Sequence, residues 1–195
     1  MLISGRGSNL QALIDAIGDR RLDATIAVVI SNNPEAAGLE RARRAGIEGV
    51  CVDHRGWPSR EDFDRELAAQ LTSRDVGLVC LAGFMRLVGR PLLEAFPHRI
   101  LNIHPSLLPA FPGLDAQRQA VEHGVKVSGV TVHLVTGELD GGQIVLQRSV
   151  PVRDDDAAET LAARILEEEH RIYPEAVNLV LAGGWRVEGR RFIRA

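Results

Sequence analysis

The first half of the chain alternates short apolar runs with stretches of helical periodicity, and this alternation limits the folds open to it. The runs are almost continuously apolar, as in strands that are covered on both faces. Alternating strands and helices of this length predict a parallel sheet with right-handed crossovers. Strands are predicted at 1–3, 24–30, 50–52 and 76–82, and helices at 10–17, 35–45 and 59–72.

The second half departs from this pattern. The predicted strands 127–134 and 143–150 are separated by a short glycine-rich loop, which favours antiparallel pairing. The sheet is therefore expected to be mostly parallel in the N-terminal half and mixed in the C-terminal half, with helices on both faces. The other predicted elements are a strand at 100–103, a helix at 116–122, a long helix capped by 154–156 and kinked or broken near Pro174 before it ends at about Asn178, and a hairpin at 185–193.

Length and composition suit one globular domain over residues 1–195. The chain is 45% hydrophobic and 25% charged, and no apolar run approaches the roughly 20 residues of a membrane span. A net charge of −3 argues against nucleic acid or a membrane as the main partner. Arg41, Arg43 and Arg44 lie on a predicted helix and are interpreted as a solvated face.

The two cysteines indicate a reducing, cytoplasmic location. Cys51 and Cys80 lie in strand-like runs without CxxC spacing, so both are predicted to be buried thiols. The six histidines lack the spacing of metal ligands, and no metal site is expected.

A glycine-rich turn joins the first predicted strand to the first helix. Its sequence, Ser4-Gly5-Arg6-Gly7-Ser8-Asn9, places backbone N–H groups at the positive end of a helix, which suits a phosphate. Neither the dinucleotide fingerprint nor the Walker pattern is complete, so a small phosphorylated ligand fits better than NAD or ATP. The alternative is a tight turn in which Ser8 or Asn9 caps the helix. This loop alone does not separate the two interpretations.

Asn102 and His104 stand at the end of the strand predicted at 100–103. Alternate residues of a strand face the same way, so the amide and the imidazole emerge on one side. Open α/β sheets bind their ligands at the carboxyl ends of strands. For this pattern alone, polar side chains that cap neighbouring backbone are the simpler interpretation.

Asp140 precedes two glycines in a predicted loop, where an aspartate is ordinarily a turn former. Together with Asn102 and His104 it would make a coherent acyl-transfer site. An amide donor and an imidazolium can stabilise an oxyanion, and a nearby carboxylate raises the pKa of an imidazole. No serine or cysteine nucleophile is evident, so direct attack by a substrate amine is the simplest chemistry.

The chain resembles the phosphoribosylglycinamide formyltransferases, the folate-dependent enzymes of purine synthesis. The pattern Asn-x-His-Pro-Ser-x-Leu-Pro, joined at this separation to Leu-Asp-x-Gly, carries the resemblance, which covers nearly the whole chain. It implies a Rossmann-like formyltransferase fold and transfer of formyl from 10-formyltetrahydrofolate to the amine of 5-phosphoribosylglycinamide. The matching segments are 4–11, 82–86, 101–109, 129–142 and 168–174.

The resemblance also implies roles for individual residues. It assigns the catalytic roles to Asn102, which would hold the formyl oxygen, to His104, an acid and oxyanion partner, and to Asp140, which would raise the pKa of His104. Residues 1–100 would form a phosphate-binding half and 101–195 a catalytic and folate-binding half. The substrate-binding residues implied are Gly7, Ser8, Asn9 and Glu169 for the ribotide, and Arg60, Met85, Arg86, Leu87, Val88 and Asn102 for the folate.

Three residues of this sequence each have two interpretations. His133 is either a supporting residue of the site or a satisfied core histidine, and Met85 and Leu87 could equally be core residues. Two departures from the family pattern are a shortened first strand, as if a few residues were lost at the start, and Gly137, which favours a more mobile folate-side loop. The sequence leaves a homodimer open.

Three other functions compete. A 10-formyltetrahydrofolate deformylase would use a similar site but ordinarily has an N-terminal regulatory domain, whereas this chain opens on the glycine loop. Methionyl-tRNA formyltransferase would need a further C-terminal domain and a basic surface. A non-catalytic folate- or phosphate-binding module could share the fold, although Asn102, His104 and Asp140 are all present.

Overall fold

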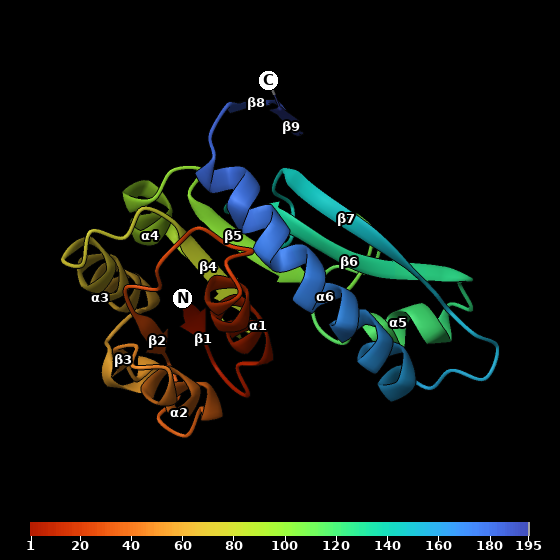
Figure 1. Cartoon of the computed structure of the whole chain (residues 1–195), viewed down its shortest axis with the longest axis horizontal. Coiled ribbons are helices and arrows are strands. Elements are labelled where there is room, and N and C mark those ends of the chain that lie inside the picture. Colours follow the sequence, from red (N-terminus) through yellow and green to blue (C-terminus); the bar gives the residue numbers. More distant parts are fainter. Residues whose placement is uncertain (195) are drawn as a thin grey trace.

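A nine-stranded sheet runs through the molecule in the order β3-β2-β1-β4-β5-β6-β7-β9-β8 (Figure 1). The computed structural model describes residues 1–194. Strands β1 to β5 are parallel, whereas β6 runs antiparallel to β5 and β7 antiparallel to β6. The strands are β1 (Leu2–Ile3), β2 (Val29–Ser31), β3 (Gly49–Cys51), β4 (Val79–Ala82), β5 (Ile100–His104), β6 (Val127–Leu134), β7 (Ile144–Pro151), β8 (Trp185–Glu188) and β9 (Arg191–Arg194).

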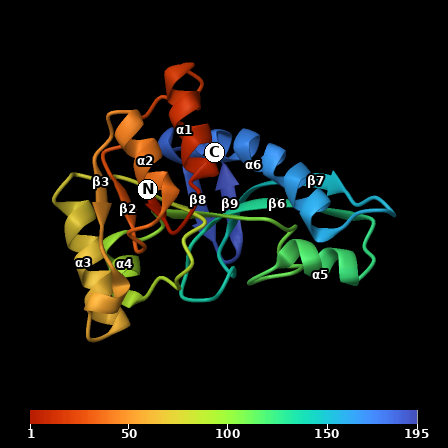
Figure 2. The same ribbon diagram turned by 90° about the horizontal axis from the view of Figure 1, so that it is seen from below.

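Helices cover both faces of the sheet, as predicted. Helices α1, α2 and α6 lie on one face and α3 and α4 on the other (Figure 2). None of the helices within residues 1–194 combines the length and hydropathy needed to cross a membrane. The helices are α1 (Ser8–Gly18), α2 (Ala37–Arg44), α3 (Arg60–Thr72), α4 (Arg90–Ala95), α5 (Ala116–Glu122) and α6 (Ala158–Leu181), with a 3-10 turn, η1 (His54–Gly56).

Two cores form because strand side chains alternate between the faces. Ile3 and Leu101 belong to the core under α1 and α6, whereas Leu2 and Ile100 belong to the core under α3 and α4. On α6, Tyr173 is fully buried and its hydroxyl donates to the carbonyl of Leu81 at 2.7 Å. The long helix is thereby tied to the centre of the sheet.

The predicted mixed sheet and terminal hairpin are confirmed, but some boundaries are wrong. The strand predicted at 24–30 is only Val29–Ser31, because the parallel register sets Leu2 opposite Ile30 and the chain begins at Met1, whose N-terminal amine donates to the Val28 carbonyl, so 24–27 have no partner on β1. The strand predicted at 76–82 begins only at Val79, and α4 and η1 were not predicted. Helix α6 continues past Pro174 to Leu181, so the expected break is wrong.

The helix caps were predicted with mixed success. Ser59 and Asp62, at the start of the helix predicted at 59–72, form a cap-like pattern in the sequence, and in the structure the Ser59 side chain accepts from the N–H of Asp62. Neither Ser8 nor Asn9 caps α1, whose first position is preceded by Gly7 at φ 70°. The N-cap of α6 is Ala157, not an aspartate of 154–156, and its N–H donates to the Thr160 hydroxyl.

Two surface predictions also need correction. Cys51 is exposed because it lies on β3, an edge strand, whereas Cys80 is buried as expected. Arg43 and Arg44 are exposed and pair with Glu40, but Arg41 is half-buried and donates to the carbonyl of Arg6 at 2.9 Å. Arg41 is therefore part of the glycine-loop region and not of a solvated face.

The loop before β7 gives a stability prediction. A Cβ at Gly142 would lie 1.7 Å from the Leu134 carbonyl oxygen, whereas a Cβ at Gly137 meets nothing within 4 Å. We expect Gly142→Ala to lower the free energy of unfolding by about 1–3 kcal/mol, as overpacking does, and Gly137→Ala to change it by less than about 0.5 kcal/mol. Urea unfolding of both variants measures this difference, and equal stabilities would contradict the close approach of Gly142 to Leu134.

Candidate active site

Four polar side chains meet at the carboxyl end of β5. The carboxylate of Asp140 lies between two imidazoles, with Oδ2 3.4 Å from Nδ1 of His104 and Oδ1 3.6 Å from Nε2 of His133. Asn102 joins them, with its Nδ2 3.1 Å from the same Nε2 of His133. The structure thus brings together the three residues predicted to be catalytic, and it adds His133.

The sheet places these side chains by register. Asn102 and His104 alternate with Leu101 and Ile103 on β5, so they share one face, as predicted. The antiparallel pairing of β5 with β6 sets Asn102 opposite His133. His133 therefore contacts the site directly, which favours the supporting role over that of an ordinary core histidine.

Asp140 reaches the two histidines from the loop between β6 and β7. Its backbone has a φ of 50°, and its Oδ2 accepts the N–H of Gly113 at 2.8 Å. Its side chain is 8% exposed. Burial raises the pKa of this carboxyl, but the His133 ring, the Gly113 N–H and the electrostatic interaction with the His104 ring together outweigh it, so the pKa is lowered. The group is therefore a buried carboxylate.

The pKa of His104 differs from the expectation. Burial lowers it, and this outweighs the raising effects of the Phe111 carbonyl, which lies 2.8 Å from Nε2, and of Asp140. Asp140 does act in the predicted direction, but the net pKa lies below the ordinary 6.5 and not above it. The site therefore holds a mainly neutral imidazole at pH 7, for the physical reason that charging it costs desolvation.

A cavity of about 140 Å³ opens beside the cluster. Asn102, His133 and Asp140 form part of its lining and His104 does not, so three of the four polar side chains face a space that a ligand can enter. Of the predicted folate residues, Met85 does not line this cavity and is 67% exposed. The other lining residues are Arg60, Leu81, Phe84, Arg86, Leu87, Val88, Val135, Thr136, Gly137, Glu138 and Leu139, which come from both halves of the chain.

The glycine loop lies at the end of β1. Gly7 has the positive φ that a glycine tolerates best, and a Cβ there would lie 2.7 Å from Cα of Gly38 on α2. Asn9 donates from Nδ2 to Glu169 Oε2 at 2.6 Å, so two of the predicted ribotide residues, 160 positions apart in the chain, are in contact. Burial raises the pKa of Glu169, with Asn9 and Arg6 opposing it.

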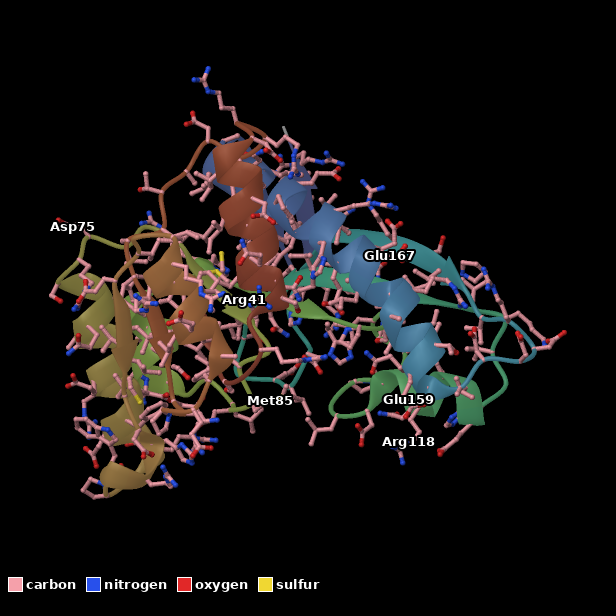
Figure 3. All side chains as sticks on the ribbon, turned by 60° about the horizontal axis from the view of Figure 1, so that its bottom comes forward. Arg41, Asp75, Met85, Arg118, Glu159 and Glu167 are labelled. Atoms are coloured by element: carbon pink, nitrogen blue, oxygen red, sulfur yellow. The ribbon has the colours of Figure 1, made fainter. Side chains whose placement is uncertain are left out.

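A second cavity, of about 590 Å³, begins at this loop and runs between α1 and α6. Ser8 lines it, together with Arg41 from α2 and Glu167 from α6, two of the residues labelled in Figure 3. His170 and Arg171 also face it, so its lining carries charges of both signs. Of Gly7, Ser8 and Asn9, Ser8 lines this cavity, which therefore reaches the glycine loop at the beginning of α1.

Sequence reasoning missed several backbone contributors. The Phe111 carbonyl and the Gly113 N–H hold His104 and Asp140, yet backbone groups carry no residue-type signature. The pair Pro112-Gly113 indicated only a turn. Within residues 1–194 there is no group of three or more His, Cys, Asp or Glu side chains arranged to hold a metal ion.

With this geometry in view, comparison with known proteins identifies the family. The family model described as formyl transferase matches residues 1–177. The chain belongs to the formyl transferase family. Its fold is that of the family's solved structures: a glycinamide ribonucleotide transformylase from Symbiobacterium toebii is 59% identical, with a TM-score of 0.96 over 98% of this chain and 90% of that one.

Curated relatives differ in length. Phosphoribosylglycinamide formyltransferase of Escherichia coli (strain K12) is 45% identical over 190 residues, which cover 97% of this chain and 87% of the relative. The human trifunctional purine biosynthetic protein adenosine-3 is 46% identical over 183 residues, 94% of this chain, but this chain spans only 18% of that relative's length. The similarity therefore extends over one part of the trifunctional proteins and over most of the shorter bacterial one.

The electrostatics of the cluster can be tested directly. Since the Asp140 carboxylate raises the pKa of His104 against the effect of burial, Asp140→Asn should lower that pKa further. NMR titration of the His104 ring in the parent chain and the variant measures the change, with Asp23→Asn on the exposed surface as a control. An unchanged or higher His104 pKa in Asp140→Asn would contradict the assigned contact.

Proposed function

We propose that the chain transfers the formyl group of 10-formyltetrahydrofolate to the amine of 5-phosphoribosylglycinamide, a step of purine biosynthesis. One observation carries the proposal: a buried carboxylate joins His104 and His133 beside Asn102, at the wall of a cavity. Membership of the formyl transferase family supports a folate-type formyl donor. The name of the Escherichia coli relative supports the acceptor.

The two substrates approach the cluster from neighbouring strand ends. The ribotide phosphate binds the backbone N–H groups of Gly7, Ser8 and Asn9 at the start of α1, where the helix dipole favours an anion. Glu169 contacts the ribotide, since its carboxylate already lies beside Asn9. To make this contact, the ribotide must either displace the hydrogen bond between Asn9 and Glu169 or bind the same two groups while that bond persists.

The folate occupies the smaller cavity. Leu87 and Val88 supply apolar contact, and Arg60 and Arg86 supply positive charge toward the glutamate end of the folate. Met85 contributes through its backbone, because most of the residue is exposed and it does not line the cavity. The formyl group then lies at Asn102, one of three residues of the polar cluster that line the cavity.

The reaction begins when the lone pair of the ribotide amine attacks the formyl carbon. An N–C bond forms and the formyl oxygen becomes an oxyanion, which Asn102 stabilises by donating an N–H; one such donor is worth roughly 2.7–4 kcal/mol in the transition state. The C–N bond to the folate then breaks. Atoms balance when one proton leaves the amine and one reaches the departing folate nitrogen.

His104 is placed to carry charge during these steps. It is mainly neutral before the reaction, so it can accept a proton, and the Asp140 carboxylate stabilises the imidazolium that results. The His104 imidazolium, as a cation beside the oxyanion, lowers the energy of the oxyanion further. The lowered pKa of His104 therefore sets the order of the proposed steps. His104 becomes charged during the reaction and is not charged before it.

The decisive experiment is a formyl-transfer assay with and without the ribotide. We expect consumption of 10-formyltetrahydrofolate to require added 5-phosphoribosylglycinamide. Full-rate release of formate without the ribotide would favour a deformylase, and transfer to methionyl-tRNA would favour that formyltransferase. Binding of both ligands without any transfer would favour a non-catalytic module.

The catalytic residues give a second prediction. His104→Ala and Asp140→Asn should each lower kcat by about 10²–10⁴-fold, the range for loss of a proton-transfer group or of one oxyanion donor. Ribotide binding, measured by calorimetry, should persist because the glycine loop is untouched. Asp23→Asn, on the exposed surface, serves as the matched control. Near-normal turnover by either variant would refute its catalytic assignment.

A further inference from the structure

Ser4 lies at the point where the strand order of the sheet reverses. From β1 the chain proceeds through β2 to β3 on one side, and then returns to β4 and β5 on the other side of β1. Ser4 follows β1 directly, and β4, which pairs with β1, leads into the loop that contains Met85. Open α/β sheets bind ligands at such a reversal, since the two loops leave in opposite directions.

The Ser4 hydroxyl joins these two loops. It accepts the backbone N–H of Met85 at 2.8 Å and donates its own proton to Oδ1 of Asn32 at 2.5 Å. Asn32 is buried and its Nδ2 lies 3.3 Å from Nδ1 of His54, so its amide oxygen is held toward Ser4. A hydroxyl has one proton, and with that proton given to Asn32, a lone pair faces Met85.

The other ends of both loops are anchored separately. The N–H of Gly89 donates to the buried Asp64 carboxylate at 2.7 Å. This hydrogen bond ties to α3 the end of residues 85–88, which form the folate strip of the proposed function. On the glycine-loop side, the N–H of Gly38 donates to the Gly5 carbonyl at 3.0 Å and Arg41 holds the Arg6 carbonyl. Between the two loops themselves, the contact through Ser4 spans 81 positions of the chain.

We propose that Ser4 is a positioning residue that couples the ribotide and folate subsites. The inference rests on the proposed function, because it takes Gly7–Asn9 as the ribotide loop and 85–88 as the folate strip. Ser4 stands three residues before Gly7 and its hydroxyl bonds the first residue of the strip, so a displacement of either loop changes the geometry of the other. Binding of one substrate thereby orders the subsite of the second.

Removal of the hydroxyl should weaken this coupling without removing either subsite. In Ser4→Ala the Met85 N–H loses its acceptor and Oδ1 of Asn32 loses its donor. A hydrogen bond of this kind contributes enough for a change of about 2–10-fold in a binding constant. We expect the parent chain to bind tetrahydrofolate several-fold more tightly when the ribotide is present, and this ratio to fall toward one in Ser4→Ala.

Calorimetric titration of tetrahydrofolate, with and without saturating 5-phosphoribosylglycinamide, measures the ratio. Asp64→Asn is the informative comparison: it weakens the other anchor of the strip, so folate affinity should fall while the ratio persists. Ser73→Ala removes an exposed serine hydroxyl at the end of α3 and should change neither quantity. A ratio of one in the parent chain, or an unchanged ratio in Ser4→Ala, would overturn the proposal.

Two further measurements distinguish a failure of the coupling proposal from a failure of the proposed function on which it rests. If Ser4→Ala does not fold, Ser4→Cys keeps a side chain of similar shape with weaker hydrogen bonds and should give an intermediate ratio. If both ligands bind with coupling but no formyl is transferred, the proposed function fails and the role of Ser4 stands. If formyl is transferred but the ratio does not respond to Ser4, only the coupling proposal fails.

Discussion

One buried carboxylate holds the candidate active site together. Asp140 contacts both His104 and His133 and also accepts the N–H of Gly113, so it joins β5, β6 and two loops at a single point. Charge buried in this way is costly unless it is paired and hydrogen-bonded, and here both oxygens have partners. Replacement of this group should therefore alter the imidazoles on either side as well as the loop that carries it.

The sheet explains why the partners of Asp140 come together. The parallel half brings the ends of β1 and β4 to one edge, and the antiparallel pairing of β6 adds His133 from a strand that runs the opposite way. A purely parallel sheet would not place His133 opposite Asn102. The mixed sheet thus places the glycine loop, the smaller cavity and the Asp140 cluster at the same edge, and the Ser4 hydroxyl joins the glycine loop to the loop that contains Met85.

Periodicity and spacing predicted most of the fold, whereas the family resemblance grouped Asn102, His104 and Asp140 as one site. The alternation of strands and helices, the turn to an antiparallel arrangement and the shared face of Asn102 and His104 all follow from local pattern. Strand ends were less predictable, because 24–27 need a partner strand that the register of β1 does not provide. The sign of the His104 pKa shift depends on burial by distant segments. The contacts that hold His104 and Asp140 come from the backbone of Phe111 and Gly113, and backbone groups carry no residue-type signature.

The proposed function requires that two substrates meet at the carboxyl end of β5. A crystal structure of the chain with 5-phosphoribosylglycinamide and a non-reactive folate analogue tests this requirement most directly. We expect the ribotide phosphate on the N–H groups of Gly7–Asn9, and the amine and the formyl-equivalent atom both in contact with Asn102 and His104. A folate bound away from Asn102, or an amine out of reach of the formyl position, would contradict it.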